Sequence, residues 1–281
     1  MRKAILIALT VTLILCAQGL SQTGTKKRRP LPYEYGRVII NNSSEQADMP
    51  PVVFEHWIHR SKFTCRVCHV DIGFVMKAGA TGITATANAQ GFYCGTCHNG
   101  AMLVAGKTVF ASCPKPEAPG TPSQPGLTVR RSVAEAKRCA RCHSLGQDVA
   151  SDYDFFKFSE PLPKARFGNG IDWEKAEEFG VIKPASFLDG VSTLRKSMPV
   201  QKDFTLAPKV KGMPDIIFSH KKHTVWNGCE VCHPEIFAGK KGDTRYTMVD
   251  ISQGKFCGAC HTSVAFPLTE CQRCHSQPVQ P

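Results

Sequence analysis

Six copies of one short motif, Cys-x-x-Cys-His, are the residues of this chain best suited to chemistry. The copies are Cys65, Cys68 and His69; Cys94, Cys97 and His98; Cys139, Cys142 and His143; Cys229, Cys232 and His233; Cys257, Cys260 and His261; and Cys271, Cys274 and His275. Two thiols three positions apart can form thioethers with the two vinyl groups of one porphyrin, and the next His then lies under the ring as an iron ligand. The motifs therefore predict six covalently bound haem c groups, each with one proximal His.

Other uses of paired cysteines fit this spacing less well. A zinc ribbon needs two Cys pairs per metal but no His directly after each pair, and a thioredoxin-like motif occurs once, inside a βαβ pattern that this sequence lacks. A disulfide scaffold is the remaining alternative for a Cys-rich exported chain. None of the three explains six repeated histidines.

The four histidines outside the motifs form two pairs. They are His56, His59, His220 and His223, and each pair precedes the first motif of a group of three. A lone His is usually structural, but a pair duplicated at the same offsets before haem motifs predicts distal iron ligands.

The chain contains an internal duplication. Phe54-x-His56-x-x-His59 aligns without a gap with Phe218-x-His220-x-x-His223, and the stretch 91–98 aligns with 254–261. A third motif follows in each half, so the sequence predicts two three-haem modules in tandem. We define the first module as residues 51–145 and the second as 214–281.

The remaining segments contain no haem motif. The first module has a Pro-rich insertion near 113–130, expected to be a loop, with Cys113 as a lone thiol. Residues 146–213 form a connector in which Asp172 as N-cap and Gly180 as C-terminal stop predict a short helix. We expect this connector to pack on the modules.

The first residues resemble a secretory signal peptide, assigned to 1–21 and followed by a tail at 22–50. Arg2 and Lys3 precede about 14 apolar residues, fewer than the roughly 20 that a membrane-spanning helix needs. An uncleaved anchor is the alternative; a lipid attached at Cys16 is another, although Leu15 fits a lipobox poorly. The prediction is a periplasmic, extracellular or outer-surface protein.

The net charge of +12 does not indicate a nucleic-acid partner. Six haems add about −12 through their propionates, and cleavage of the signal peptide removes the charges of Arg2 and Lys3, so the mature holoprotein is close to neutral. The basic residues 26–29 are interpreted as a solvated segment, with peripheral contact to a membrane surface as the alternative.

The paired His motifs, each followed by three Cys-x-x-Cys-His copies, resemble the three-haem cytochrome c7 family, a relative of cytochrome c3. The resemblance covers both modules and leaves the tail, insertion and connector unexplained. It implies that His59 binds the first haem and His56 the second, and that His223 and His220 do the same in the second module.

The sequence departs from the simplest family pattern at the third haem of each module, because no further His is present to bind that haem. Some multidomain relatives use Met there, and an axial Met raises the reduction potential. Met76 in the first module and Met248 in the second are therefore expected as ligands, with Met102 open as well. Packing of these side chains against porphyrin faces is the alternative.

Fold and function follow from the cofactors. A module of about 65 residues buries little side-chain core, so haems are expected to fill the interior, leaving a small, mostly irregular and α-helical fold. Haems with two protein ligands predict electron transfer. The resemblance implies a role in anaerobic or extracellular respiration, between inner-membrane quinol-oxidising cytochromes and outer-membrane or extracellular cytochromes. The chain is not expected to be an enzyme. The alternatives are a reductase that uses a His-poor haem, and a subunit of a membrane redox complex or filament.

Overall fold

The computed structural model describes residues 28–113, 133–146, 148–196 and 198–277. The chain divides into a unit at Met1–Pro30 and a second unit at Leu31–Pro281, which contains both modules. The predicted signal peptide, Cys16 and almost all of the Pro-rich insertion lie outside the described residues. Within the described ranges, no helix is long and apolar enough to cross a membrane.

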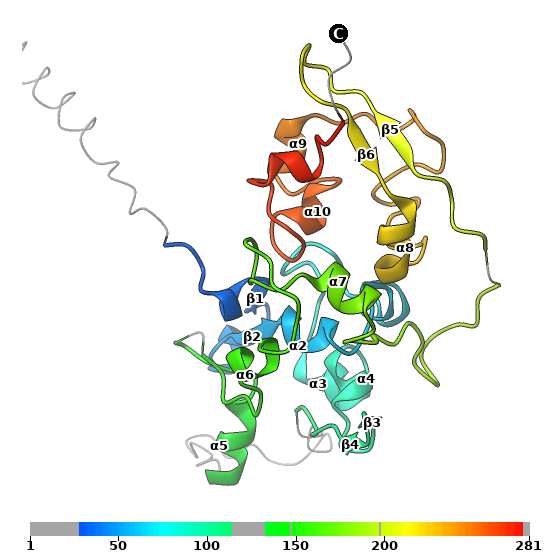
Figure 1. Cartoon of the computed structure of the whole chain (residues 1–281). Coiled ribbons are helices and arrows are strands. Elements are labelled where there is room, and N and C mark those ends of the chain that lie inside the picture. The colour runs from blue at the N-terminus through cyan, green and yellow to red at the C-terminus, as the bar shows by residue number, and fades with distance from the viewer. Residues whose placement is uncertain (1–27, 114–132, 147, 197, 278–281) are drawn as a thin grey trace, which may run out of the picture. The chain divides into compact units, whose positions relative to one another are not determined.

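Regular elements are short throughout the second unit (Figure 1). The helices are α2 (His56–Arg60), α3 (Ala85–Ala89), α4 (Cys94–Cys97), α5 (Val133–Cys139), α6 (Phe155–Ser159), α7 (Trp173–Glu178), α8 (His220–Asn227), α9 (Met248–Ser252) and α10 (Gly258–His261). Single turns are the 3₁₀ segments η1 (Pro32–Glu34), η2 (Glu45–Ala47) and η4 (Cys271–Arg273) and the π-helical segment η3 (Val67–Ile72). The mostly irregular and helical fold expected from the sequence is confirmed.

In the residues that the structure describes, the strands form three antiparallel hairpins. They are β1 (Arg37–Ile40) with β2 (Val52–Glu55), β3 (Leu103–Val104) with β4 (Lys107–Thr108), and β5 (Phe204–Leu206) with β6 (Ile216–Phe218). The first and third hairpins are equivalent, because each second strand ends just before a His pair. Their first strands lie in the expected tail and connector, so each His pair is supported by residues outside its module. The boundaries that we assigned to the modules stay predictions.

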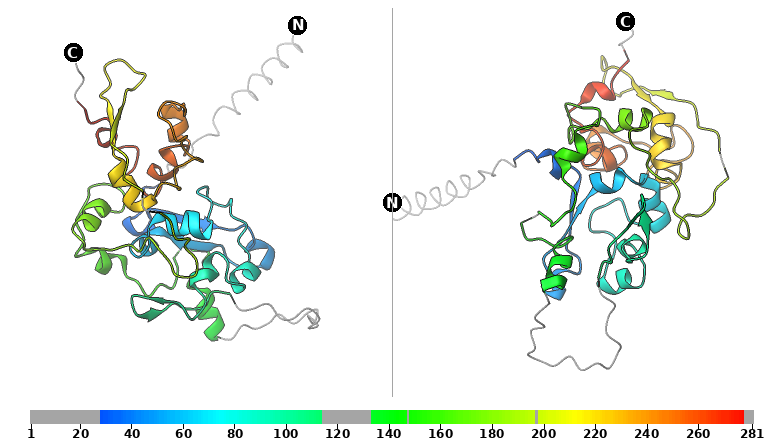
Figure 2. Two further views of the ribbon diagram at one scale, coloured as in Figure 1. Left: turned by 90° about the vertical axis from the view of Figure 1, so that its right-hand side faces the viewer. Right: turned by 60° about the horizontal axis from the view of Figure 1, so that its bottom comes forward.

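The apolar core lies largely in the connector. Its buried side chains are Trp57, Phe155, Leu162, Ile171, Trp173, Ala176 and Ile182, six of them between residues 155 and 182. Trp226 of α8 packs against the same cluster, and the connector passes close to α2 in the views of Figure 2. The connector is therefore part of the folded interior.

Helix α7 is the helix that the sequence predicts in the connector. The Asp172 side chain accepts the backbone N–H of Lys175, and Gly180, with φ +67°, ends the segment in a left-handed conformation that glycine adopts without strain. Burial of Trp173 and Ala176 on one face then holds this six-residue helix in place.

Candidate functional site

The motif residues lie on single helical turns. In five of the six motifs the His backbone N–H donates to the carbonyl of the first Cys, at 2.8–3.0 Å. The remaining motif, the one that begins at Cys65, overlaps the π-helical segment η3, which contains Cys68 and His69. Residues three and four apart share one face of such a turn, so each motif presents two thiols and one imidazole to the same side.

The motif thiols are unpaired, and most of them are half-buried. All thirteen described cysteines are free, and burial raises the pKa of Cys68, Cys94 and Cys260 to about 12. They are therefore neutral thiols. Among the described residues, no three or more His, Cys, Asp or Glu side chains are grouped so as to hold a metal ion.

The histidines share one orientation. In nine of the ten, Nδ1 lies 2.6–3.1 Å from a backbone carbonyl oxygen. The pairs are His56 with Gly36, His59 with Glu55, His69 with Phe74, His143 with Pro50, His220 with Lys202, His223 with Ser219, His233 with Phe237, His261 with Phe266, and His275 with Pro214. A carbonyl oxygen can only accept, so Nδ1 carries the proton and the Nε2 lone pair is left for a metal.

His98 is the exception. Its buried Nδ1 has no hydrogen-bond partner among the described residues. Burial lowers the pKa of His98, and the Phe110 backbone opposes this shift in part. Burial also lowers the pKa of His56, His59 and His261 to about 4. Neutral imidazole is the form that binds metals, so burial favours the ligand state.

An aromatic ring positions each His pair. The Phe54 ring lies 4.4 Å from the His59 ring and 4.8 Å from the His56 ring. Phe218 repeats this arrangement at 4.4 Å from His223 and 5.1 Å from His220. The Phe at the start of each repeated motif therefore supports both imidazoles.

The fold also brings predicted ligands of neighbouring motifs together. The His59 ring lies 6.2 Å from that of His98, and the His223 ring lies 6.2 Å from that of His261. The interplanar angles of these pairs are 56° and 58°. The duplication thus extends from the sequence to the relative placement of imidazoles.

The third motif of each module joins the hairpin before the His pair. The Val53 N–H donates to the Cys142 carbonyl at 2.7 Å, and isolated bridges join Val52 to His143 and Ile216 to His275. A cavity of about 420 Å³ lies beside His275. These contacts place the third motif next to the residues that lead into the His pair.

The methionines proposed as ligands differ in exposure. The Met248 side chain, at the start of α9, is 54% exposed, whereas Met76 and Met102 are half-buried. Met248 and the first residue of α3, Ala85, occupy equivalent positions. Only the second module thus has a Met at this position. Binding of iron by Met76, Met102 or Met248 stays a prediction.

The sequence did not predict one arrangement that supports a motif His, a stack of an Arg guanidinium on a Phe ring beside the imidazole. The guanidinium of Arg141 lies 3.8 Å from the Phe110 ring centroid, and that ring lies 4.5 Å from His98. In the second module, Arg273 lies over Phe266, whose ring is 4.2 Å from His261. The Arg that both third motifs share before their second Cys could have indicated this stack.

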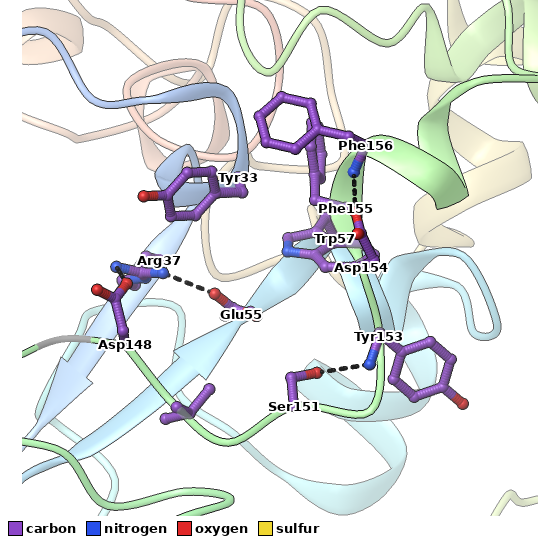
Figure 3. A pocket seen from close by; sticks show the side chains of 11 residues that line it. Tyr33, Arg37, Glu55, Trp57, Asp148, Ser151, Tyr153, Asp154, Phe155 and Phe156 are labelled. Carbon is purple, nitrogen blue, oxygen red and sulfur yellow. Dashed lines mark hydrogen bonds and ion pairs between the residues drawn. The ribbon is translucent and has the colours of Figure 1, made fainter.

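A buried ion pair joins Arg37 of β1 to Glu55 of β2 (Figure 3). The Arg37 guanidinium contacts the Glu55 carboxylate at 2.7 Å in a cavity of about 300 Å³ that Trp57 also lines. Glu55 directly precedes His56, and its carbonyl accepts from His59. This ion pair therefore anchors the end of β2, and the His pair follows directly after that end.

A family model and several solved structures are similar to this chain. The family described as "Cytochrome c7 and related cytochrome c" matches residues 52–144 and 216–276. A solved c7-type three-heme cytochrome domain is 41% identical, with 28% of this chain and 99% of that chain covered and a TM-score of 0.25. The C-terminal hexaheme fragment of GSU1996 is 21% identical, with 89% and 99% covered and a TM-score of 0.24. Its N-terminal hexaheme fragment is 22% identical, with 85% and 98% covered and a TM-score of 0.23.

A comparison with curated proteins found no match. The family match alone spans more than half of the chain and includes all six motifs and both His pairs. The chain therefore belongs to the family of cytochrome c7 and related c-type cytochromes.

Proposed function

We propose that this chain is an exported hexahaem cytochrome that transfers single electrons between redox proteins. The observation that carries the proposal is the common imidazole orientation, with Nδ1 donating to a backbone carbonyl in nine of ten histidines. Such a bond to the second nitrogen is the usual support of a metal-bound His, because it sets both the tautomer and the ring direction.

The residues fit haem c at six places. Each motif offers two free thiols for thioethers and one imidazole on the same face. Burial lowers the pKa of His56 and His261 to about 4, which keeps these two imidazoles neutral. Haem c supplies one-electron chemistry when bound, at a potential set by its axial ligands and surroundings.

The sparse core of the modules supports haem-filled interiors. Apart from the side chains of the connector cluster, the buried apolar residues of the described chain are Val53, Val67, Val231 and Ile251. So few buried side chains do not stabilise two modules, and covalently attached porphyrins would supply the missing apolar contact.

The ligand assignments implied by the family resemblance complete the proposal. His59 and His223 would bind the first haem of their modules and His56 and His220 the second, with Met76 and Met248 at the third. The signal-like N-terminus supports export to the periplasm or cell surface, where inner-membrane and outer-membrane cytochromes would be the partners.

The test is an intact-mass and haem assay on protein from a host that matures c-type cytochromes. We expect a mass increase of six haems in the wild type, and five haems in the double variant Cys139→Ser, Cys142→Ser. The matched control is Cys113→Ser, which should keep six because this thiol belongs to no motif. Colourless protein, or zinc bound at the thiols, would refute the proposal.

A reductase that uses a haem at His143 or His275 is the second candidate, because no second His serves either motif. It predicts that carbon monoxide or nitrite changes the absorbance of the reduced protein. An unchanged spectrum supports the carrier.

A further inference from the structure

One arginine joins the two modules at their imidazole-bearing segments. Arg60, the last residue of α2, directly follows His59, and its Nη1 donates to the Val264 carbonyl at 2.7 Å. Val264 lies three residues after His261. A single side chain thus links the His pair of the first module to the second motif of the other.

Two indoles enclose the same guanidinium. The Arg60 Cζ atom lies 4.4 Å from the ring centroid of Trp173 in α7 and 5.0 Å from that of Trp226 in α8. A desolvated cation over an indole is stabilised by the negative face of the ring. Arg60 therefore contacts the connector and both modules, and packing fixes its position.

The charge of Arg60 has no acidic partner in the described part of the chain. Its Nε is buried without a hydrogen bond, and the ionisable groups that act on it are the thiols of Cys65 and Cys260 and the phenol of Tyr35. A guanidinium stays protonated in proteins. A positive charge without a protein carboxylate beside it therefore lies near one motif thiol of each module.

Further contacts pack the segment before β1 against the segment that follows His261. The Tyr35 hydroxyl donates to the Ala265 carbonyl at 2.5 Å, and a Cβ atom added at Gly36 would lie 3.5 Å from Val264 Cγ1. The Gly36 carbonyl also accepts from His56. The segments that orient His56 and the segment after His261 are thus the surfaces on which the modules dock.

We propose that Arg60 sets the reduction potentials at the junction of the two modules. Its charge, held in a buried site, would favour the reduced state of the groups attached at Cys65 and at Cys260. A positive charge stabilises an added electron more strongly in a low-dielectric interior than in water. The inference rests on the proposed function, since it requires haem at both motifs.

Three variants of the full-length holoprotein test this role. Arg60→Gln removes the charge but keeps a donor for the Val264 carbonyl, and Arg60→Lys keeps the charge. Arg166→Gln is the matched control, because the Arg166 side chain is 82% exposed and makes only a 3.5 Å contact with Glu270. If Arg60→Gln does not mature, Arg60→Met carries the same prediction.

The measurement is a potentiometric titration followed by visible absorbance, with haem-methyl NMR signals to assign individual haems. For Arg60→Gln we expect two haems, one in each module, to become harder to reduce by at least about tenfold, or ~59 mV for one electron. Arg60→Lys and Arg166→Gln should keep the wild-type potentials. Unchanged potentials in a six-haem Arg60→Gln protein would overturn the inference, as would an equal shift of all six haems or an equal loss in Arg60→Lys. Absence of haem from the wild type would instead refute the proposed function.

Discussion

A glycine inside the second motif of each module provides the sharpest stability test. A Cβ atom added to Gly95 would lie 1.8 Å from the backbone oxygen of Asn88 in α3, and one added to Gly258 would lie 1.8 Å from that of Ile251 in α9. Both glycines have ordinary φ angles, so space and not backbone conformation requires them. The substitution to examine is Gly95→Ala.

The expected cost follows from the size of the overlap. Real Cβ contacts are no shorter than 3.0 Å, so α3 and α4 must separate by more than an ångström, and a backbone carbonyl cannot rotate away. Overpacking of this kind costs about 1–3 kcal/mol. Strain in the hydrogen bonds of the linking turn, Phe92 N–H to Ala87 and Gly95 N–H to Phe92, both 2.9 Å, adds about 1 kcal/mol each. We expect a loss of about 3–5 kcal/mol.

The assay is urea unfolding of the holoprotein followed by far-UV circular dichroism. Gly82→Ala and Gly239→Ala are the matched controls, because an added Cβ atom meets nothing within 4 Å at either position. Both should be neutral or stabilising by up to about 1 kcal/mol. If Gly95→Ala unfolds at the same urea concentration as these controls, the close packing of α3 on α4 is wrong.

Two further outcomes can be measured on the same protein. Arg195→Gln should lower the free energy of unfolding by about 2 kcal/mol, because Asp71, with its side chain 1% exposed, loses a 2.7 Å ion pair and keeps the Ser192 hydroxyl at 2.6 Å and the Arg66 guanidinium at 4.0 Å. Lys175→Gln removes a 3.5 Å contact with Asp172 from a side chain that is 56% exposed, and should cost less than about 1 kcal/mol in the same urea titration. Equal costs for the two variants would contradict the argument. His220→Ala should leave one iron with an open position, seen as carbon monoxide binding to the reduced protein that the wild type lacks; an unchanged spectrum would refute the ligand role.

Much of the candidate site is local and could be predicted without a structure. The spacing of Cys94, Cys97 and His98 follows from the chemistry of one porphyrin edge, and a single helical turn brings the three together. The helix at α7 was likewise predicted from its cap and stop. The role of Gly95 was not, because the repeat aligns it with Gly258 but the Asn88 carbonyl that excludes a side chain comes from packing.

By itself, the sequence determined the six attachment motifs, the two His pairs and the tandem repeat, since each depends on residues a few positions apart. Only the tertiary structure decided that the connector forms the apolar core, that strands outside the modules support the His pairs, and that Arg60 meets Val264 across 204 positions. Such contacts depend on which surfaces remain to be buried once the local turns have formed. No periodicity along the chain predicts which of these surfaces pack together.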